Sequence, residues 1–83
     1  MTDLEYLVLD ELYFVQEFQS LFQACEVSEE DLVLTLVSLK AKEWIKVLSD
    51  VDDEAKEPLE LSTEYANYFY LATKKGLLAH NST

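Results

Sequence analysis

The sequence predicts a single α+β domain over residues 1–83 that is mostly α-helical. Three observations support this class. Apolar residues recur at intervals of three and four through residues 3–25 and 28–42, which is typical of helices that bury one face. Residues 44–49, "WIKVLS", alternate as a short strand does and carry β-branched side chains. The chain holds one glycine and one proline, so few sharp turns interrupt it.

Length and composition allow one core and little more. A chain of 83 residues buries only about 60–65% of its unfolded surface. Hydrophobic residues make up 49% and aromatic residues 12%, which is too apolar for a disordered acidic tail. The chain is therefore expected to fold and to have apolar surface left over for a partner. It has no room for a second domain or a deep substrate cavity.

The first 25 residues are expected to form two helices, roughly 3–13 and 16–25, with a bend near "YFV". Seven apolar residues keep helical spacing: Leu4, Leu7, Val8, Leu12, Val15, Phe18 and Phe22. Four others fall off that stripe: Leu9, Tyr13, Phe14 and Leu21. One straight helix would thus be apolar around much of its circumference, and the bend residues have weak helix propensity. One long helix is the alternative.

A third helix is expected to begin at Ser28. The Ser28 side chain can cap the helix, with Asp31 three positions on in a pattern like a capping box. Acidic residues crowd the first turn, and Lys40 and Lys42 lie near the other end, which matches the helix dipole. Helix stability alone therefore explains the charges at the two ends.

The third helix has a wider apolar arc than one buried face requires. Leu32, Leu36 and Leu39 form the centre of the arc. Three further residues widen it beyond half the circumference: Val33, Leu34 and Val37. A surface helix needs a stripe of roughly 100°. A narrow polar strip lies opposite, formed by Asp31, Thr35, Ser38 and Lys42. The helix is therefore either packed on both sides within the domain or left with an apolar flank.

The second half of the chain is expected to hold further strands and a short helix. Residues 50–58, "DVDDEAKEP", form a charged connector, and "LELS" at 59–62 is expected to return as a strand. The residues that follow fit two structures. One is a strand over 67–72 and then a short helix capped by Thr73; the other is a continuous helix from about 63 to 79. Four bulky residues in a row favour the strand.

Two segments resemble winged-helix proteins, including regulators of the MarR and PadR kind. "VSEEDLVLTLVSLKAKEWIKVLSD" is similar to their recognition helix and first strand. "YFYLATKKGLL" is similar to their returning wing strand and the "LT-x-x-G" opening of the next helix. The resemblance implies three helices, a short β-hairpin wing and a C-terminal helix. Glu43 stands where those proteins carry a glycine, which would ease a tight left-handed turn.

The resemblance also implies where DNA would bind. In winged helices that bind DNA, the third helix enters the major groove and the wing contacts the adjacent backbone. Carried over to this chain, the contacting residues on the helix and wing would be Thr35, Ser38, Lys42, Lys46 and Lys56.

The charge of the chain opposes that role. It holds 17 acidic residues against 6 basic ones, for a formal net charge of −11, and every basic residue is lysine. Without arginine, the chain lacks the side chain that binds guanine through two hydrogen bonds. The acidic residues of the connector would repel the phosphate backbone. We therefore expect neither nucleic acid nor an anionic membrane as target. This expectation fails if the lysines gather on one side and the acids turn wholly away from it.

A protein partner, either a second copy or another chain, accounts better for the apolar surplus. The residues expected to contact it are Val33, Leu34, Val37, Leu9, Tyr13, Tyr68 and Tyr70. Aromatic residues are enriched at the centres of interfaces, although in a small domain the same residues can form the core. A homodimer through the N-terminal helices would bury the excess with two-fold symmetry. A DNA-binding transcriptional regulator is the alternative, and a DNA mimic, whose carboxylates imitate phosphates, is a further one.

The sequence indicates no catalytic, metal or cofactor site, so we do not expect an enzyme. His80 is the only histidine and lies near the C-terminus, where we expect fraying. "DVDDE" lacks the glycine of a calcium loop, and Leu61 takes the place of its bidentate glutamate. Cys25 stands alone in an apolar stretch, so we expect a buried thiol and a cytoplasmic location. No apolar run is long enough to cross a membrane.

Overall fold

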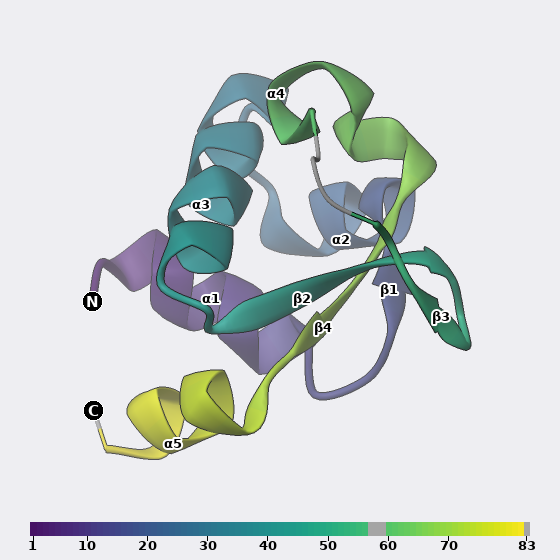
Figure 1. The fold of residues 1–83 in the computed structure, drawn as a ribbon. Coiled ribbons are helices and arrows are strands. Elements are labelled where there is room, and N and C mark those ends of the chain that lie inside the picture. Colours follow the sequence, from purple (N-terminus) through teal and green to yellow (C-terminus); the bar gives the residue numbers. More distant parts are fainter. Residues whose placement is uncertain (57–59, 83) are drawn as a thin grey trace.

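The computed structural model describes residues 1–56 and 60–82, which form an α+β domain (Figure 1). The α-helices are α1 (Asp3–Glu11), α2 (Phe18–Cys25), α3 (Glu29–Ala41), α4 (Leu61–Glu64) and α5 (Lys74–Asn81). The strands are β1 (Gln16–Glu17), β2 (Ile45–Asp50), β3 (Asp53–Glu54) and β4 (Phe69–Ala72). A short 3-10 helix, η1 (Tyr65–Asn67), links α4 to β4. The predicted α+β, mostly helical class is confirmed.

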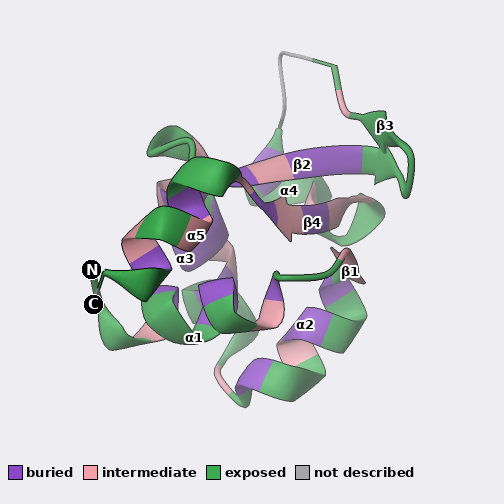
Figure 2. Cartoon of the chain, turned by 90° about the horizontal axis from the view of Figure 1, so that it is seen from below, coloured by how far each residue is buried: buried purple, intermediate pink, exposed green. Residues whose placement is uncertain are grey.

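The four strands form one antiparallel sheet in the order β1-β4-β2-β3. The central pair runs from Ile45 opposite Ala72 to Leu48 opposite Phe69. Alternate residues of this pair join the core, as the period of a strand requires. Figure 2 shows buried positions on both central strands and on the helices around them. The buried core residues of helices α1, α2 and α3, together with Leu12 at the C-cap of α1, are Val8, Leu9, Leu12, Phe18, Leu21, Cys25, Leu32, Leu36 and Leu39.

The N-terminal segment forms two helices, as predicted, and the alternative of one long helix is wrong. A complete capping box opens α1: the Thr2 side chain accepts a hydrogen bond from the Glu5 N–H, and the Glu5 side chain accepts one from the Thr2 N–H. The bend between the helices contains a strand that we did not predict. Gln16 and Glu17 pair with the free edge of β4, opposite Tyr70 and Phe69.

The remaining elements follow the predictions except at one place. Ser28 caps α3 by accepting the Asp31 N–H at 3.1 Å, and Thr73 caps α5 after β4, so the continuous helix over 63–79 is wrong. The predicted strand at 59–62 is also wrong for Glu60–Ser62. Leu61 begins helix α4 and buries its side chain in the core, and the second strand is β3 instead. Leu59 lies outside the described residues.

Glu43 adopts the left-handed conformation without a glycine, with φ at 62°. The turn is held by its surroundings. The Trp44 N–H donates to Leu39 O at 3.0 Å, the Thr73 N–H donates to Trp44 O at 2.9 Å, and Thr73 Oγ1 donates to Glu43 O at 2.8 Å. The end of α3, the start of β2 and the cap of α5 therefore meet at one junction.

Glu43→Gly is expected to raise the free energy of unfolding by about 0.5–1 kcal/mol. A residue with a Cβ is destabilised by about 1–2 kcal/mol in the left-handed region, and glycine avoids this steric cost. Part of the gain is offset because glycine loses more backbone entropy on folding. Urea denaturation measures the change. Glu43→Ala is the control, because it removes the carboxylate and keeps the Cβ. A gain in Glu43→Ala equal to that in Glu43→Gly would assign the effect to charge and contradict the backbone explanation.

Candidate protein-interaction surface

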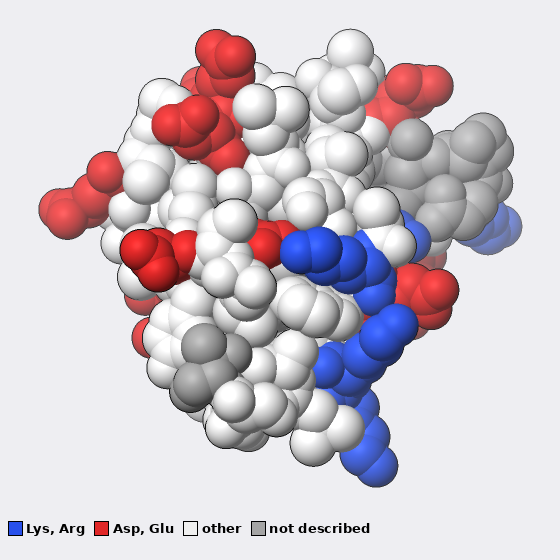
Figure 3. Space-filling model, turned by 90° about the vertical axis from the view of Figure 1, so that its left-hand side faces the viewer, with Lys and Arg blue, Asp and Glu red and all other residues white. Residues whose placement is uncertain are grey.

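The side of α3 that faces solvent is apolar after its acidic first turn. Leu34 is 60% exposed and Val37 39% exposed, Ala41 is exposed, and Val33 is partly buried. Positions 34, 37 and 41 recur at three and four, so they lie along one side of the helix. We call Val33, Leu34, Val37 and Ala41 the α3 stripe. This side of the molecule faces the viewer in Figure 3, where uncharged side chains form a band between the charged groups.

Two open grooves flank the α3 stripe, and Leu34 lines both. The groove between α3 and α4 is lined by Glu29, Glu30, Val33, Leu34, Ser62 and Tyr65. Tyr65 is held there because its hydroxyl donates to a Glu29 carboxylate oxygen, and this bond raises the pKa of Tyr65. The groove between α3 and α1 is lined by Thr2, Glu5, Leu34, Thr35, Ser38 and Lys42. Each groove thus places at least one carboxylate beside the exposed leucine.

The polar strip of α3 is turned toward α1 and bonded within the domain. Thr35 is buried and its Oγ1 donates to Asp31 O at 2.8 Å. Ser38 Oγ donates to Glu5 Oε2 at 3.1 Å, and Lys42 Nζ lies 2.6 Å from the same oxygen. Three of the residues expected to contact DNA therefore already have partners in the domain. For Thr35 the expectation is wrong, since its side chain is not available to a ligand.

Glu5 is a buried carboxylate, only 3% exposed. Burial alone would raise its pKa. The hydrogen bonds from Lys42, the Thr2 N–H and Ser38 outweigh burial and lower the pKa of Glu5 to about 2. Glu5 is therefore ionised at neutral pH and paired with Lys42, whose ammonium also lies 4.8 Å from the centroid of the Trp44 ring. This pair fixes α1 against the end of α3.

Two residues expected at a protein interface belong to the core instead. Leu9 and Tyr70 have no exposed surface. Leu9 lies on the inner face of α1. Tyr70 lies on the inner face of β4, where burial raises the pKa of its phenol and its hydroxyl donates to Tyr65 O at 2.6 Å. Tyr68 is partly buried. A satisfied core tyrosine, the alternative weighed from the sequence, is the correct interpretation of Tyr70.

Tyr13, in the bend after α1, and His80 tie the C-terminal helix to the N-terminal segment. The hydroxyl of Tyr13 lies 3.0 Å from His80 Nδ1 and donates to Asn81 Oδ1 at 3.0 Å. The His80 ring is buried and stacks on Tyr6 with the ring centroids 4.1 Å apart. Its Nε2 lies 3.5 Å from a carboxylate oxygen of Asp10. His80 is thus a packed residue, and the expectation of a frayed end there was wrong.

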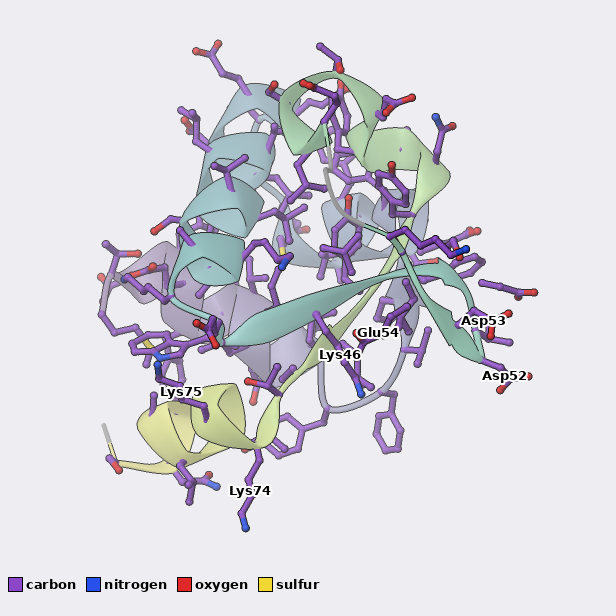
Figure 4. All side chains as sticks on the ribbon, in the orientation of Figure 1. Lys46, Asp52, Asp53, Glu54, Lys74 and Lys75 are labelled. Atoms are coloured by element: carbon purple, nitrogen blue, oxygen red, sulfur yellow. The ribbon has the colours of Figure 1, made fainter. Side chains whose placement is uncertain are left out.

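The lysines visible in Figure 3 gather along one side of that face, and carboxylates lie both beside them and over the other side. The acids are not wholly turned away, because Glu5 is bonded to Lys42. Figure 4 places Lys74 and Lys75 at the start of α5, and Asp52 and Asp53 at the far end of the β2–β3 hairpin. The condition that would have overturned the electrostatic expectation is therefore not met.

Cys25 is buried, as predicted, and burial raises the pKa of its thiol to about 11. No three His, Cys, Asp or Glu side chains within 1–56 and 60–82 come together as a metal site would require. In the same ranges, no helix combines the length and the apolar character needed to cross a membrane.

Comparisons with protein-family models, curated proteins and solved structures give no significant match for this chain. The residues that sequence reasoning missed are Ala41, which completes the α3 stripe, and Glu5, which holds Lys42. Ala41 follows Leu34 by seven residues, so its place on the stripe could have been read from the helical period. No sequence signal links Glu5 to Lys42.

Proposed function

We propose that this chain is a protein-interaction module on a winged-helix scaffold, and that a partner binds at the α3 stripe. The observation that carries the proposal is the orientation of α3. Its apolar side faces solvent through Leu34 and Val37, while Ser38 and Lys42 are bonded to α1. An exposed apolar patch with a charged rim is typical of a protein-binding surface.

The order of elements supports the winged-helix scaffold. A helix, a short strand and two helices precede β2, and β4 returns between β1 and β2 before the last helix. Residues 26–28 join α2 to α3 as a three-residue turn, with Glu26 left-handed at φ 52°. The wing is where this chain departs from the pattern. After β3 the chain returns to the domain, and Leu61 of α4 is buried in the core.

The charges at the start of α3 also favour a protein over DNA. Helix-turn-helix proteins place the N-terminal residues of the recognition helix against base edges. Here that turn carries Glu29, Glu30 and Asp31. DNA binding is the second candidate, since Lys46, Lys74 and Lys75 could contact phosphates (Figure 4). The proposal includes a cytoplasmic location, where the buried thiol of Cys25 would stay reduced.

A photo-crosslinking amino acid placed at position 37, in place of Val37, is expected to crosslink this chain to another polypeptide in the cells that express the chain. Its adducts should be destroyed by protease and survive nuclease, because the apolar stripe excludes phosphate. The same amino acid at exposed Asn67, on η1, is the control and should give few adducts. Nuclease-sensitive adducts at Val37 would contradict the proposal. In that case the chain should also bind duplex DNA. The logarithm of its binding constant should then fall with the logarithm of the salt concentration, with a slope of roughly −0.9 per phosphate contact.

A further inference from the structure

We propose that the partner at the α3 stripe is a second copy of this chain, with the two α3 helices antiparallel about a two-fold axis. The inference rests on the proposed function and names its partner. Helix α3 is the longest helix of the described residues, and its exposed side is apolar from Val33 to Ala41. A closed two-fold pair uses one self-complementary surface on both copies.

The spacing of the α3 stripe suits this arrangement. A two-fold axis near the middle of α3 sets Leu34 of one copy against Val37 of the other, twice. The 13 residues of α3 span roughly 20 Å at 1.5 Å per residue. Ala41 is small, so it does not hold the two helices apart, and packed helices approach to about 8–10 Å between their axes. The grooves on either side of Leu34 leave room for side chains of the second copy.

Charge complementarity favours the antiparallel orientation. The first turn of α3 carries Glu29, Glu30 and Asp31, and its last turn carries Lys40. Figure 3 shows an uncharged band on this face, with lysines on one side of it and carboxylates on both sides. Rotation by 180° about an axis through that band turns the acidic end of one copy onto the lysine end of the other, and Glu30 then lies near Lys40 of the other copy. The two helix dipoles are antiparallel as well.

The N-terminal helices suit a two-fold contact less well. The outward side of α1 presents Asp3 and Asp10 beside Leu7. No lysine precedes Lys40 in the sequence, so two copies of α1 would place acid against acid. The N-terminal homodimer expected from the sequence is therefore replaced in this inference by a dimer through α3.

Sedimentation equilibrium of the full chain, from micromolar to millimolar concentration, tests the inference. The wild type is expected to dimerise, and Leu34→Asp is expected to weaken the dimer at least about tenfold by burying a carboxylate at the contact. Leu7→Asp is the matched control, since Leu7 is also exposed, at 38%. It should leave the dimer unchanged. Circular dichroism checks that both variants fold.

A charge swap makes the orientation testable. Glu30→Lys and Lys40→Glu should each weaken the dimer about tenfold, and the double variant should recover most of the loss, because the swap restores both symmetric pairs. A parallel pair of helices, or a contact elsewhere, predicts no recovery. Absence of recovery would therefore overturn the antiparallel α3 arrangement.

Other outcomes separate this inference from the proposed function. A dimer that Leu7→Asp disrupts and Leu34→Asp spares would overturn the inference and keep self-association through the N-terminal helices. A monomer whose Val37 crosslinks join it to a different protein would overturn the inference and support the proposed function. A monomer with nuclease-sensitive crosslinks would overturn both.

Discussion

Gly76→Ala is expected to destabilise the domain by about 3 kcal/mol. A Cβ at Gly76 would lie 2.0 Å from Trp44 O and 2.9 Å from Trp44 C. Both are backbone atoms, so no side-chain rotation relieves the clash, and α5 must move away from the start of β2. Helix propensity alone predicts the opposite, a gain of about 1 kcal/mol for alanine over glycine. The sign of the change therefore tests the packing directly.

Urea denaturation of Gly76→Ala beside Lys75→Ala isolates the effect. Lys75 precedes Gly76 in α5 and is exposed, so its replacement should change the free energy of unfolding by no more than about 0.5 kcal/mol. If Gly76→Ala were as stable as the wild type, α5 would not approach Trp44 as the structure places it. Movement of α5 should also disturb its cap, in which the Gly76 N–H donates to Thr73 Oγ1 at 3.0 Å.

Lys42→Met is expected to cost about 3 kcal/mol at neutral pH. It removes the ammonium that pairs with Glu5 and leaves a buried carboxylate without its counter-charge. The apolar stem is kept, so little packing is lost. With the hydrogen bond and the charge of Lys42 removed, the pKa of Glu5 should rise from about 2, while the bonds from the Thr2 N–H and Ser38 still lower it. Lys74→Met is the control, because Lys74 is exposed and its loss should have little effect.

The effect of Lys42→Met should depend on pH in a defined window. The pKa of Glu5 in the folded wild type is about 2, below its ordinary value of 4.5. Its contribution is therefore complete above pH 4.5 and is lost as the pH falls toward 2. The stability gap between wild type and Lys42→Met should narrow over this range. Urea denaturation at several pH values measures the gap, and a constant gap would mean that the charge of Glu5 is not its cause.

Elements with local signals were predictable from the sequence. Ser28 and Thr73 cap their helices with their own side chains, and the strand after Trp44 has a clear composition. The elements that were missed depend on distant partners. β1 forms because β4 offers a free edge, and α4 forms where Leu61 reaches the core. The left-handed turn at Glu43 is held by contacts from Thr73, thirty residues away along the chain.

The candidate site was predictable to the extent that helical period defines it. The width of the apolar arc identified Val33, Leu34 and Val37, and the structure leaves all three at least partly exposed. The repeat of apolar residues along a helix or strand does not show which side another element packs against. The buried residues Leu9 and Tyr70 therefore could not be distinguished from surface residues by sequence. The role of Lys42 was hidden for the same reason, since its partner Glu5 lies 37 positions earlier.

The edges of the sheet limit how any other protein can approach. β1 and β3 are each two residues long, and their side chains include the carboxylates of Glu17, Asp53 and Glu54. An incoming strand would gain few main-chain hydrogen bonds and would meet negative charge. Recognition by strand addition, and the growth of fibrils from these edges, are therefore disfavoured. The chain can carry an apolar helix on its surface without its sheet becoming a template for aggregation.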